Sequence, residues 1–283
     1  MFPFQMSFLT LPYPQFDPVA LHLGSISVRW YGLAYAAGLL IGWLYLRRMI
    51  ATPRIWGGPP PLSREHLDSL LLWVTAGVVI GGRLIGILLY DPMYYIKNPF
   101  EIIAVWHGGM AFHGGLLGVI LAILLFSRRH LLTALQVGDL VAASVPIGLF
   151  FGRVANFING ELWGRTSNVP WAMVFPDPSA GPLPRHPSQL YEAVLEGIVL
   201  GIVLWWLIWR QGRLQQQGFV TGAFLVGYGL ARVTAEAFRE GDSTWFFQSG
   251  VVTAGMLYSI PMVLIGTLLI WWATHRYTAV MPS

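Results

Sequence analysis

The chain has 283 residues, of which 55% are hydrophobic and only 11% are charged. Soluble domains carry about 25% charged residues, so this composition, with a mean hydropathy of +0.59, excludes an ordinary soluble protein. The chain has no cysteine, which excludes disulfides, thiolate metal sites and a cysteine nucleophile. We interpret the net charge of +4 as a sign of membrane orientation and anionic lipid, and not of nucleic-acid binding.

Apolar segments of about the 20 residues that a membrane span requires recur along the chain. They lie at about 31–49, 67–89, 111–127, 137–157, 189–209, 219–238 and 250–273. The sequence therefore predicts an all-α integral membrane protein with about seven transmembrane helices, forming a single polytopic domain over residues 1–283. Residues 158–188 contain six prolines and predict a small irregular head outside the membrane.

The distribution of Lys and Arg predicts the orientation of these spans. One set of loops carries nine basic residues and the opposite set carries five. Cytoplasmic loops are the richer in Lys and Arg, so we expect the N-terminus outside the cell and the C-terminus in the cytoplasm. The head then lies on the outer side.

Polar residues gather where the fourth span ends. Arg153 and Asn156 are three apart on one helical face, and Asn159 and Glu161 follow in a Gly-rich turn. An arginine in hydrocarbon costs several kcal/mol unless it is paired or faces a polar cavity. These residues therefore predict a polar site at the outer end of this helix.

The sixth span carries a second polar stripe, formed by Tyr228, Arg232, Glu236 and Arg239. At helical spacing these residues share one face, which predicts that the face contacts protein or water and not lipid. Two interpretations remain open: Arg232 and Glu236 neutralise each other as an i,i+4 pair, or Arg232 joins Arg153 in binding a phosphate.

Histidine and acid positions also allow alternatives. His113, preceding Gly114-Gly115, is either a general base or a turn histidine bonded to backbone. Residues 185–192 either begin a helix, with Ser188 as its N-cap, or bring Gln189 and Glu192 to the site. His107, His113 and His186 lack the spacing of a compact ligand set, so we expect no metal.

Four stretches, at residues 30–33, 108–115, 152–165 and 185–192, resemble the signature motifs of the prolipoprotein diacylglyceryl transferases. They occur in the expected order, and the resemblance runs over nearly the whole chain. It implies an enzyme of the bacterial inner membrane that needs no cofactor. The implied reaction transfers the diacylglyceryl group of phosphatidylglycerol to the lipobox cysteine thiol of a preprolipoprotein, the first step of lipoprotein maturation.

The resemblance also implies site residues. The catalytic set would be His113 as the thiol base with Arg153 and Arg232 on the phosphate. Substrate-binding residues would be Tyr31, Asn156, Asn159, Glu161, Gly164, Gln189, Tyr228, Glu236 and Arg239. The chain departs from the family at Ala111, where a serine is common, and in a head that is short between Trp171 and Pro184.

Two other classes of membrane protein compete with this interpretation. A transporter or flippase for an anionic lipid would also use arginines within its spans. The polar motifs gather on the outer side instead of the midplane, and the two halves show no repeat, which argues against transport. An intramembrane protease would need a Ser–His or paired-Asp arrangement within its spans, and Ser144 and Asp139 have no evident partner for one.

Overall fold

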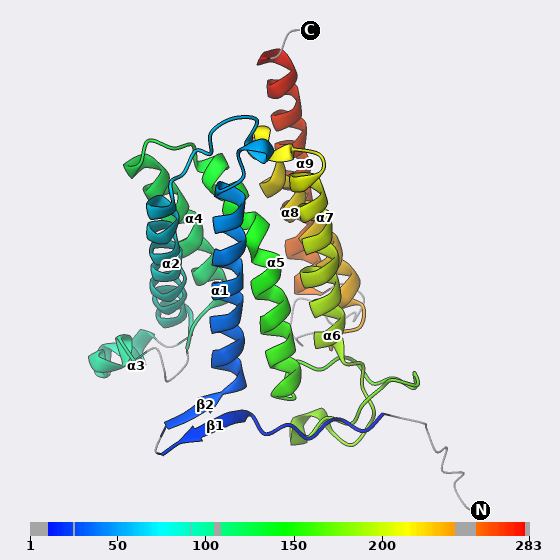
Figure 1. Cartoon of the computed structure of the whole chain (residues 1–283). Coiled ribbons are helices and arrows are strands. Elements are labelled where there is room, and N and C mark those ends of the chain that lie inside the picture. Colours follow the sequence, from blue (N-terminus) through cyan, green and yellow to red (C-terminus); the bar gives the residue numbers. More distant parts are fainter. Residues whose placement is uncertain (1–10, 25, 91, 105–108, 241–252, 281–283) are drawn as a thin grey trace, which may run out of the picture. The chain divides into compact units, whose positions relative to one another are not determined.

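The computed structural model describes residues 11–24, 26–90, 92–104, 109–240 and 253–280, and these are predominantly helical (Figure 1). The helices are α1 Trp30–Ile50, α2 Arg64–Tyr90, α3 Pro92–Lys97, α4 Phe112–Arg129, α5 Ala134–Ile158, α6 Ser188–Glu192, α7 Leu200–Trp209, α8 Phe219–Glu236 and α9 Ala254–Val280. A π-helical segment, Ala193–Val199, joins α6 to α7 without a break.

Six helices of the described chain are long and apolar enough to cross a membrane. They are Trp30–Ile50, Arg64–Leu89, Phe112–Arg129, Ala134–Ile158, Ser188–Trp209 and Gly255–Tyr277. This confirms an all-α membrane protein. Helix α8 occupies the remaining expected span, but Arg232, Glu236 and three glycines make it less apolar. A total of seven spans stays a prediction, and residues 250–252 of the last expected span lie outside the described residues.

A short β-hairpin, which was not predicted from the sequence, leads directly into α1. Strands β1 Val19–Leu23 and β2 Ile26–Arg29 pair antiparallel. Gly24, with a φ of +62°, begins their connection in the left-handed region that favours glycine. The Gly24-Ser25 dipeptide between two short segments was the available hairpin signal.

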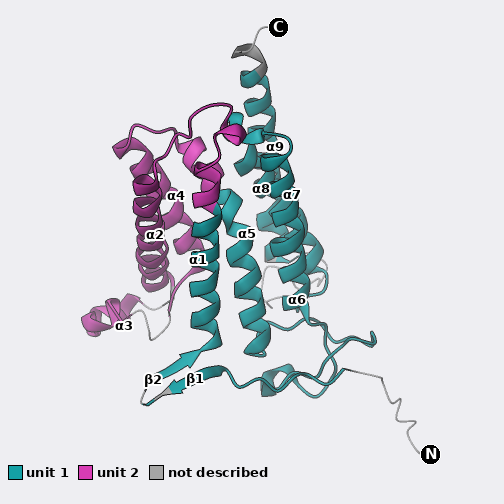
Figure 2. Ribbon diagram, in the orientation of Figure 1, with its two compact units in different colours: residues 1–45, 142–283 teal, residues 46–141 magenta. Residues whose placement is uncertain are grey.

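The chain divides into two compact units, residues 1–45 with 142–283 and residues 46–141 (Figure 2). In the smaller unit, α2 and α4 pack through glycines. A Cβ atom on Gly77 or Gly81 would overlap a carbonyl oxygen of α4, so close approach of the two backbones requires glycine. Arg83 of α2 donates from Nε to the Ile102 carbonyl oxygen at 3.0 Å.

Helices of the larger unit also pack at glycines. A Cβ atom on Gly222 of α8 would lie 2.7 Å from the carbonyl oxygen of Gly266 on α9, and the reverse contact is equal. A Cβ atom on Gly197 would lie 2.7 Å from the Cβ of Phe150 on α5. The π-helical segment and α5 are therefore in direct contact, which places the end of α6 beside α5.

Between α5 and α6 the chain forms an irregular segment with a small apolar core of its own. Phe157, Met173, Phe175 and Ala180 are buried together, and Tyr13, Trp163 and Leu190 pack against them. Backbone hydrogen bonds join this segment to the residues that follow α8, through Arg165 N to the Phe238 carbonyl oxygen at 2.9 Å. The segment is thereby fixed against the C-terminal end of α8.

Candidate active site

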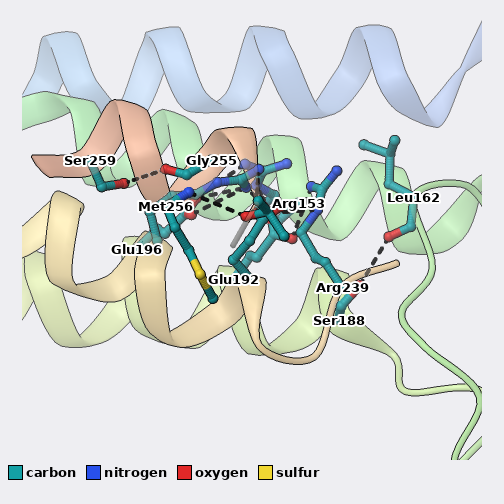
Figure 3. A network of polar contacts seen from close by, with 12 residues as sticks. Arg153, Leu162, Ser188, Glu192, Glu196, Arg239, Gly255, Met256 and Ser259 are labelled. Carbon is teal, nitrogen blue, oxygen red and sulfur yellow. Dashed lines mark hydrogen bonds and ion pairs between the residues drawn. The ribbon is translucent and has the colours of Figure 1, made fainter. Parts of the chain in front are cut away.

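Three arginines from two parts of the larger unit converge on one carboxylate, that of Glu192 at the end of α6. Arg153 of α5 lies 2.8 Å from it through Nε. Arg232 of α8 lies 3.3 Å from it through Nη1, and Arg239 lies 3.2 Å from it through Nη1 (Figure 3). Glu192, which is 1% exposed, is the common partner of all three.

Two further carboxylates complete what we term the arginine–glutamate cluster. Glu196 lies 3.2 Å from Nη2 of Arg153, and Glu236 lies 2.9 Å from Nη2 of Arg232. The cluster thus contains three arginines and three glutamates, and its formal charges balance. Glu196 is 0% exposed and Glu236 is 4% exposed. Buried charges are tolerated when they are paired and hydrogen-bonded, which accounts for so many ionised groups among apolar helices.

Arg232 and Glu236 do not form an isolated pair. The i,i+4 pair does form, but Arg232 also contacts Glu192 of another helix. The pair is therefore one edge of a network that joins α5, α6 and α8.

The π-helical segment contributes to the position of this network. Glu192 immediately precedes it and Glu196 lies within it. A π-helical turn widens the helix, and such turns are frequent at functional sites. Here it accompanies two carboxylates, four residues apart, that both reach Arg153.

A second polar set lies beside the end of α5. Asn156 donates from Nδ2 to Oε1 of Glu161 at 2.7 Å, and Gln189 donates from Nε2 to the Glu161 carbonyl oxygen at 2.5 Å. Asn159 is half-buried in the turn after α5 and donates its N–H to the Ala155 carbonyl oxygen. These amides and the Glu161 carboxylate form a hydrogen-bonding wall next to Arg153.

Gly164 anchors this wall to the end of α8. It pairs with Arg239 as an isolated β-bridge, and its N–H donates to the His186 carbonyl oxygen at 2.9 Å. A Cβ atom here would overlap the Phe238 carbonyl oxygen, so the contact needs glycine. Arg165 adds a hydrogen bond from Nε to the Arg239 carbonyl oxygen at 2.7 Å.

Tyrosines border the cluster on two sides. On α1, the hydroxyl of Tyr31 lies 3.5 Å from that of Tyr35, and Tyr35 interacts electrostatically with Arg153 and Glu161. On α8, Tyr228 interacts electrostatically with Glu196 and Arg153. Tyr228 is thus close to Arg153, whereas the place of Tyr31 at the site stays a prediction.

His113 belongs to the smaller unit, at the start of α4. Its side chain is exposed and lies against the ring of Phe112, with 5.7 Å between ring centroids. That His113 accepts the proton of the substrate thiol stays a prediction. His107 and Gly108 lie outside the described residues. Among the residues that are described, no group of three or more His, Asp or Glu side chains could hold a metal ion.

Glu196 is the main omission from the predicted site, and Glu192 was expected there only as one of the two alternatives for residues 185–192. Two acids four residues apart inside an apolar segment were the available signal, because ionisable residues within spans are costly and pair with one another.

Comparison with known proteins shows where the chain belongs. The model of the family "prolipoprotein diacylglyceryl transferase" matches residues 18–272. The chain belongs to the prolipoprotein diacylglyceryl transferase family. The predicted resemblance is thereby confirmed.

Similar proteins named phosphatidylglycerol–prolipoprotein diacylglyceryl transferase occur in several bacteria. The relative from Nitrobacter winogradskyi is 52% identical over 95% of this chain and 92% of its own. The relative from Rhodopseudomonas palustris is 53% identical over 93% and 92%, and that from Rhizobium meliloti is 53% identical over 94% of both. Together with the candidate spans, these bacterial relatives indicate a multi-pass protein of the inner membrane.

Proposed function

We propose that this protein transfers the diacylglyceryl group of phosphatidylglycerol to the lipobox cysteine of bacterial preprolipoproteins. The observation that carries the proposal is the arginine–glutamate cluster, in which Arg153 and Arg232 share the buried Glu192. The names of the relatives give the donor lipid and the acceptor protein. The cluster gives a chemical reason for the donor, since guanidinium groups bind phosphate through charge-assisted hydrogen bonds.

In the proposed reaction, the cysteine thiolate attacks the carbon of the diacylglyceryl unit that is bonded to the phosphate oxygen. A carbon–sulfur bond forms, the carbon–oxygen bond breaks, and glycerol phosphate leaves with the electron pair. Negative charge grows on the leaving phosphate, where Arg153 and Arg232 stabilise it. Because Glu192, Glu196 and Glu236 already hold these guanidinium groups, little reorganisation is needed as the charge develops.

The phosphate must compete with the carboxylates for the arginines. The empty cluster is formally neutral, so a bound phosphodiester adds one negative charge. We expect each arginine to keep one carboxylate contact and to turn its remaining N–H groups to the phosphate. Arginine suits this exchange because its planar fork offers five donors.

The remaining groups would orient the two substrates. His113 takes the thiol proton in this proposal, since histidine accepts protons near neutral pH. The headgroup of the lipid would be bound by Tyr31, Asn156, Asn159, Glu161, Gly164, Gln189, Tyr228, Glu236 and Arg239. In this proposal the protein is one polytopic domain with its N-terminus outside and the site toward the outer side, which the excess of basic residues on the opposite loops supports.

A direct test incubates the purified protein with phosphatidylglycerol liposomes and a lipobox peptide, followed by mass spectrometry of the peptide. We expect the cysteine to gain the mass of a diacylglyceryl group, and one glycerol phosphate to be released for each modified peptide. A peptide with Cys→Ser and the Arg153→Ala protein serve as controls and should show no gain. Folded wild-type protein that modifies no peptide but moves lipid between leaflets would favour the transporter.

A further inference from the structure

An apolar groove of about 350 Å³ lies between α5 and the continuous helix of the π-helical segment and α7. Its walls include Pro146, Ile147 and Phe150 on one side and Gly201 and Trp205 on the other, with Tyr45 of α1. The volume is within the range of small-molecule sites. No charged side chain lines it, so a suitable occupant is apolar.

The outer end of the groove adjoins the arginine–glutamate cluster. Phe150 lies one turn before Arg153 on α5, and Gly197 directly follows Glu196. These two groove residues are in contact, with a Cβ on Gly197 reaching 2.7 Å from that of Phe150. An occupant of the groove therefore ends beside the groups that would bind a phosphate.

The distance from Arg153 to the inner end of the groove suits one leaflet of a bilayer. The lining residues on α5 run from Ala143 to Phe150, and from Arg153 to Ala143 the helix rises about 15 Å at 1.5 Å per residue. That is half of the roughly 30 Å hydrocarbon core. The groove is also open at its side, because Ile202 is 60% exposed and Trp205 is 45% exposed. In a membrane, lipid faces such an opening.

The inner end of the groove is bounded by aromatic side chains. Trp209 donates from Nε1 to the hydroxyl of Tyr45 at 3.1 Å, and Trp205 lies one turn before Trp209. Gly201 lies one turn before Trp205 on the same helix and faces Pro146, because a Cβ here would lie 3.5 Å from the Cβ of Pro146, an ordinary contact. A larger side chain at this position would fill this part of the groove.

We propose that this groove binds one acyl chain of the donor lipid while its phosphate contacts Arg153, and that Tyr45 and Trp205 limit the chain length. The proposal rests on the function proposed above and assigns the part of the site that binds the apolar portion of the donor. Selection among donors then depends on apolar contact in the groove and not only on headgroup chemistry.

The test compares two donors, dihexanoyl and dipalmitoyl phosphatidylglycerol, with the Gly201→Phe protein. Each methylene withdrawn from apolar contact lowers affinity about fourfold, so blocking the inner groove penalises the longer chain. We expect kcat/KM for the dipalmitoyl donor to fall at least about tenfold relative to the dihexanoyl donor. Equal losses with both donors would overturn the proposal.

A control variant separates the groove from general damage. Val203→Phe introduces the same ring on the same helix at a 46% exposed position that does not line the groove, and it should leave the donor ratio unchanged. A shift of the ratio by Val203→Phe equal to that of Gly201→Phe would contradict the assignment.

Photolabelling of the wild-type protein tests the groove without any variant. A dipalmitoyl phosphatidylglycerol with a diazirine near the end of one chain is irradiated with the protein in the absence of peptide. We expect label on Tyr45, Ile147 or Trp205, and label confined to lipid-facing residues such as Ile265 of α9, 53% exposed, would overturn the proposal. This binding readout does not depend on turnover, so a wild type inactive on both donors would overturn the proposed function alone.

Discussion

At the scale of single residues, the site depends on arginine for its geometry as well as its charge. Arg153 uses Nε for Glu192 and both Nε and Nη2 for Glu196, so two carboxylates hold one edge of the guanidinium group at a fixed position. A lysine ammonium is a single point charge on a flexible stem and cannot keep a carboxylate contact while it presents an oriented pair of donors to a phosphate. The wall formed by Asn156 and Glu161 then lies beside a cation of defined orientation.

The change Arg153→Lys should lower diacylglyceryl transfer by about 10²- to 10³-fold, the loss typical of removing one oriented donor to a developing charge. Membrane insertion should be normal, because the positive charge at this position is kept. Steady-state transfer to a lipobox peptide, with protein amount normalised in reconstituted liposomes, measures the effect. Full activity of this variant would exclude the phosphate role of Arg153.

Helix packing sets the position of the cluster at the scale of elements. Gly255 of α9 lies against the cluster (Figure 3). A Cβ atom on it would lie 2.7 Å from Oε2 of Glu236 and 3.2 Å from Nε of Arg232. The nearest atom is the end of a flexible side chain, so the fold can accommodate an added methyl group. The oxygen that would have to move is nevertheless the one that contacts Arg232.

The change Gly255→Ala should therefore impair activity far more than stability. A displacement of up to 1 Å at a reacting group can reduce rate by about 10²-fold, and we expect a loss on the order of ten- to a hundredfold in kcat/KM. The midpoint of thermal unfolding in detergent should change little. Adding Glu236→Asp, which shortens the displaced carboxylate by one methylene, should recover part of the lost activity.

If the double variant is no more active than Gly255→Ala, the loss does not come from displacement of the Glu236 carboxylate. Gly148→Ala is a suitable control within the same unit, because a Cβ at Gly148 meets nothing within 4 Å. Its activity should match that of the wild type.

At the scale of the whole molecule, the irregular segment between α5 and α6 connects distant parts of the larger unit. His186 lies at its end, with Nδ1 3.0 Å from the hydroxyl of Tyr191 and its ring against that of Phe238. Burial lowers the pKa of His186 below its usual value near 6.5. The neutral imidazole is thus the form that fits between the head and the end of α8.

Acidification should weaken this contact. Because the pKa of His186 is lower in the folded state than in the unfolded state, its contribution to stability is fully present above about pH 6.5 and is lost as pH falls through the folded pKa. We expect the midpoint of thermal unfolding to fall between pH 7.5 and pH 5.5, and His186→Gln to reduce that fall. An identical pH dependence in wild type and variant would contradict a role for His186.

The sequence was a good guide to elements and a weaker one to their contacts. Apolar length located every long helix, and helical spacing placed Tyr228, Arg232 and Glu236 on one face. The meeting of Arg153, Arg232 and Arg239 at Glu192 depends on how α5, α6 and α8 pack, which spacing within one helix cannot specify. The π-helical segment has no local sequence signal, and the β-hairpin at Gly24 was missed because its strands are short.

The distribution of charge within the cluster has a consequence for how the protein is assembled. Arg153, Glu192 and Glu196 come from α5 and the helix that begins with α6, and together carry a net charge of −1. Arg232, Glu236 and Arg239 come later in the chain and carry a net charge of +1. Helices synthesised first thus present an acidic site in the bilayer, and α8, the least apolar of the expected spans, completes it. Electrostatic capture by its predecessors would keep α8 in the membrane, and it makes the order of translation part of the folding pathway.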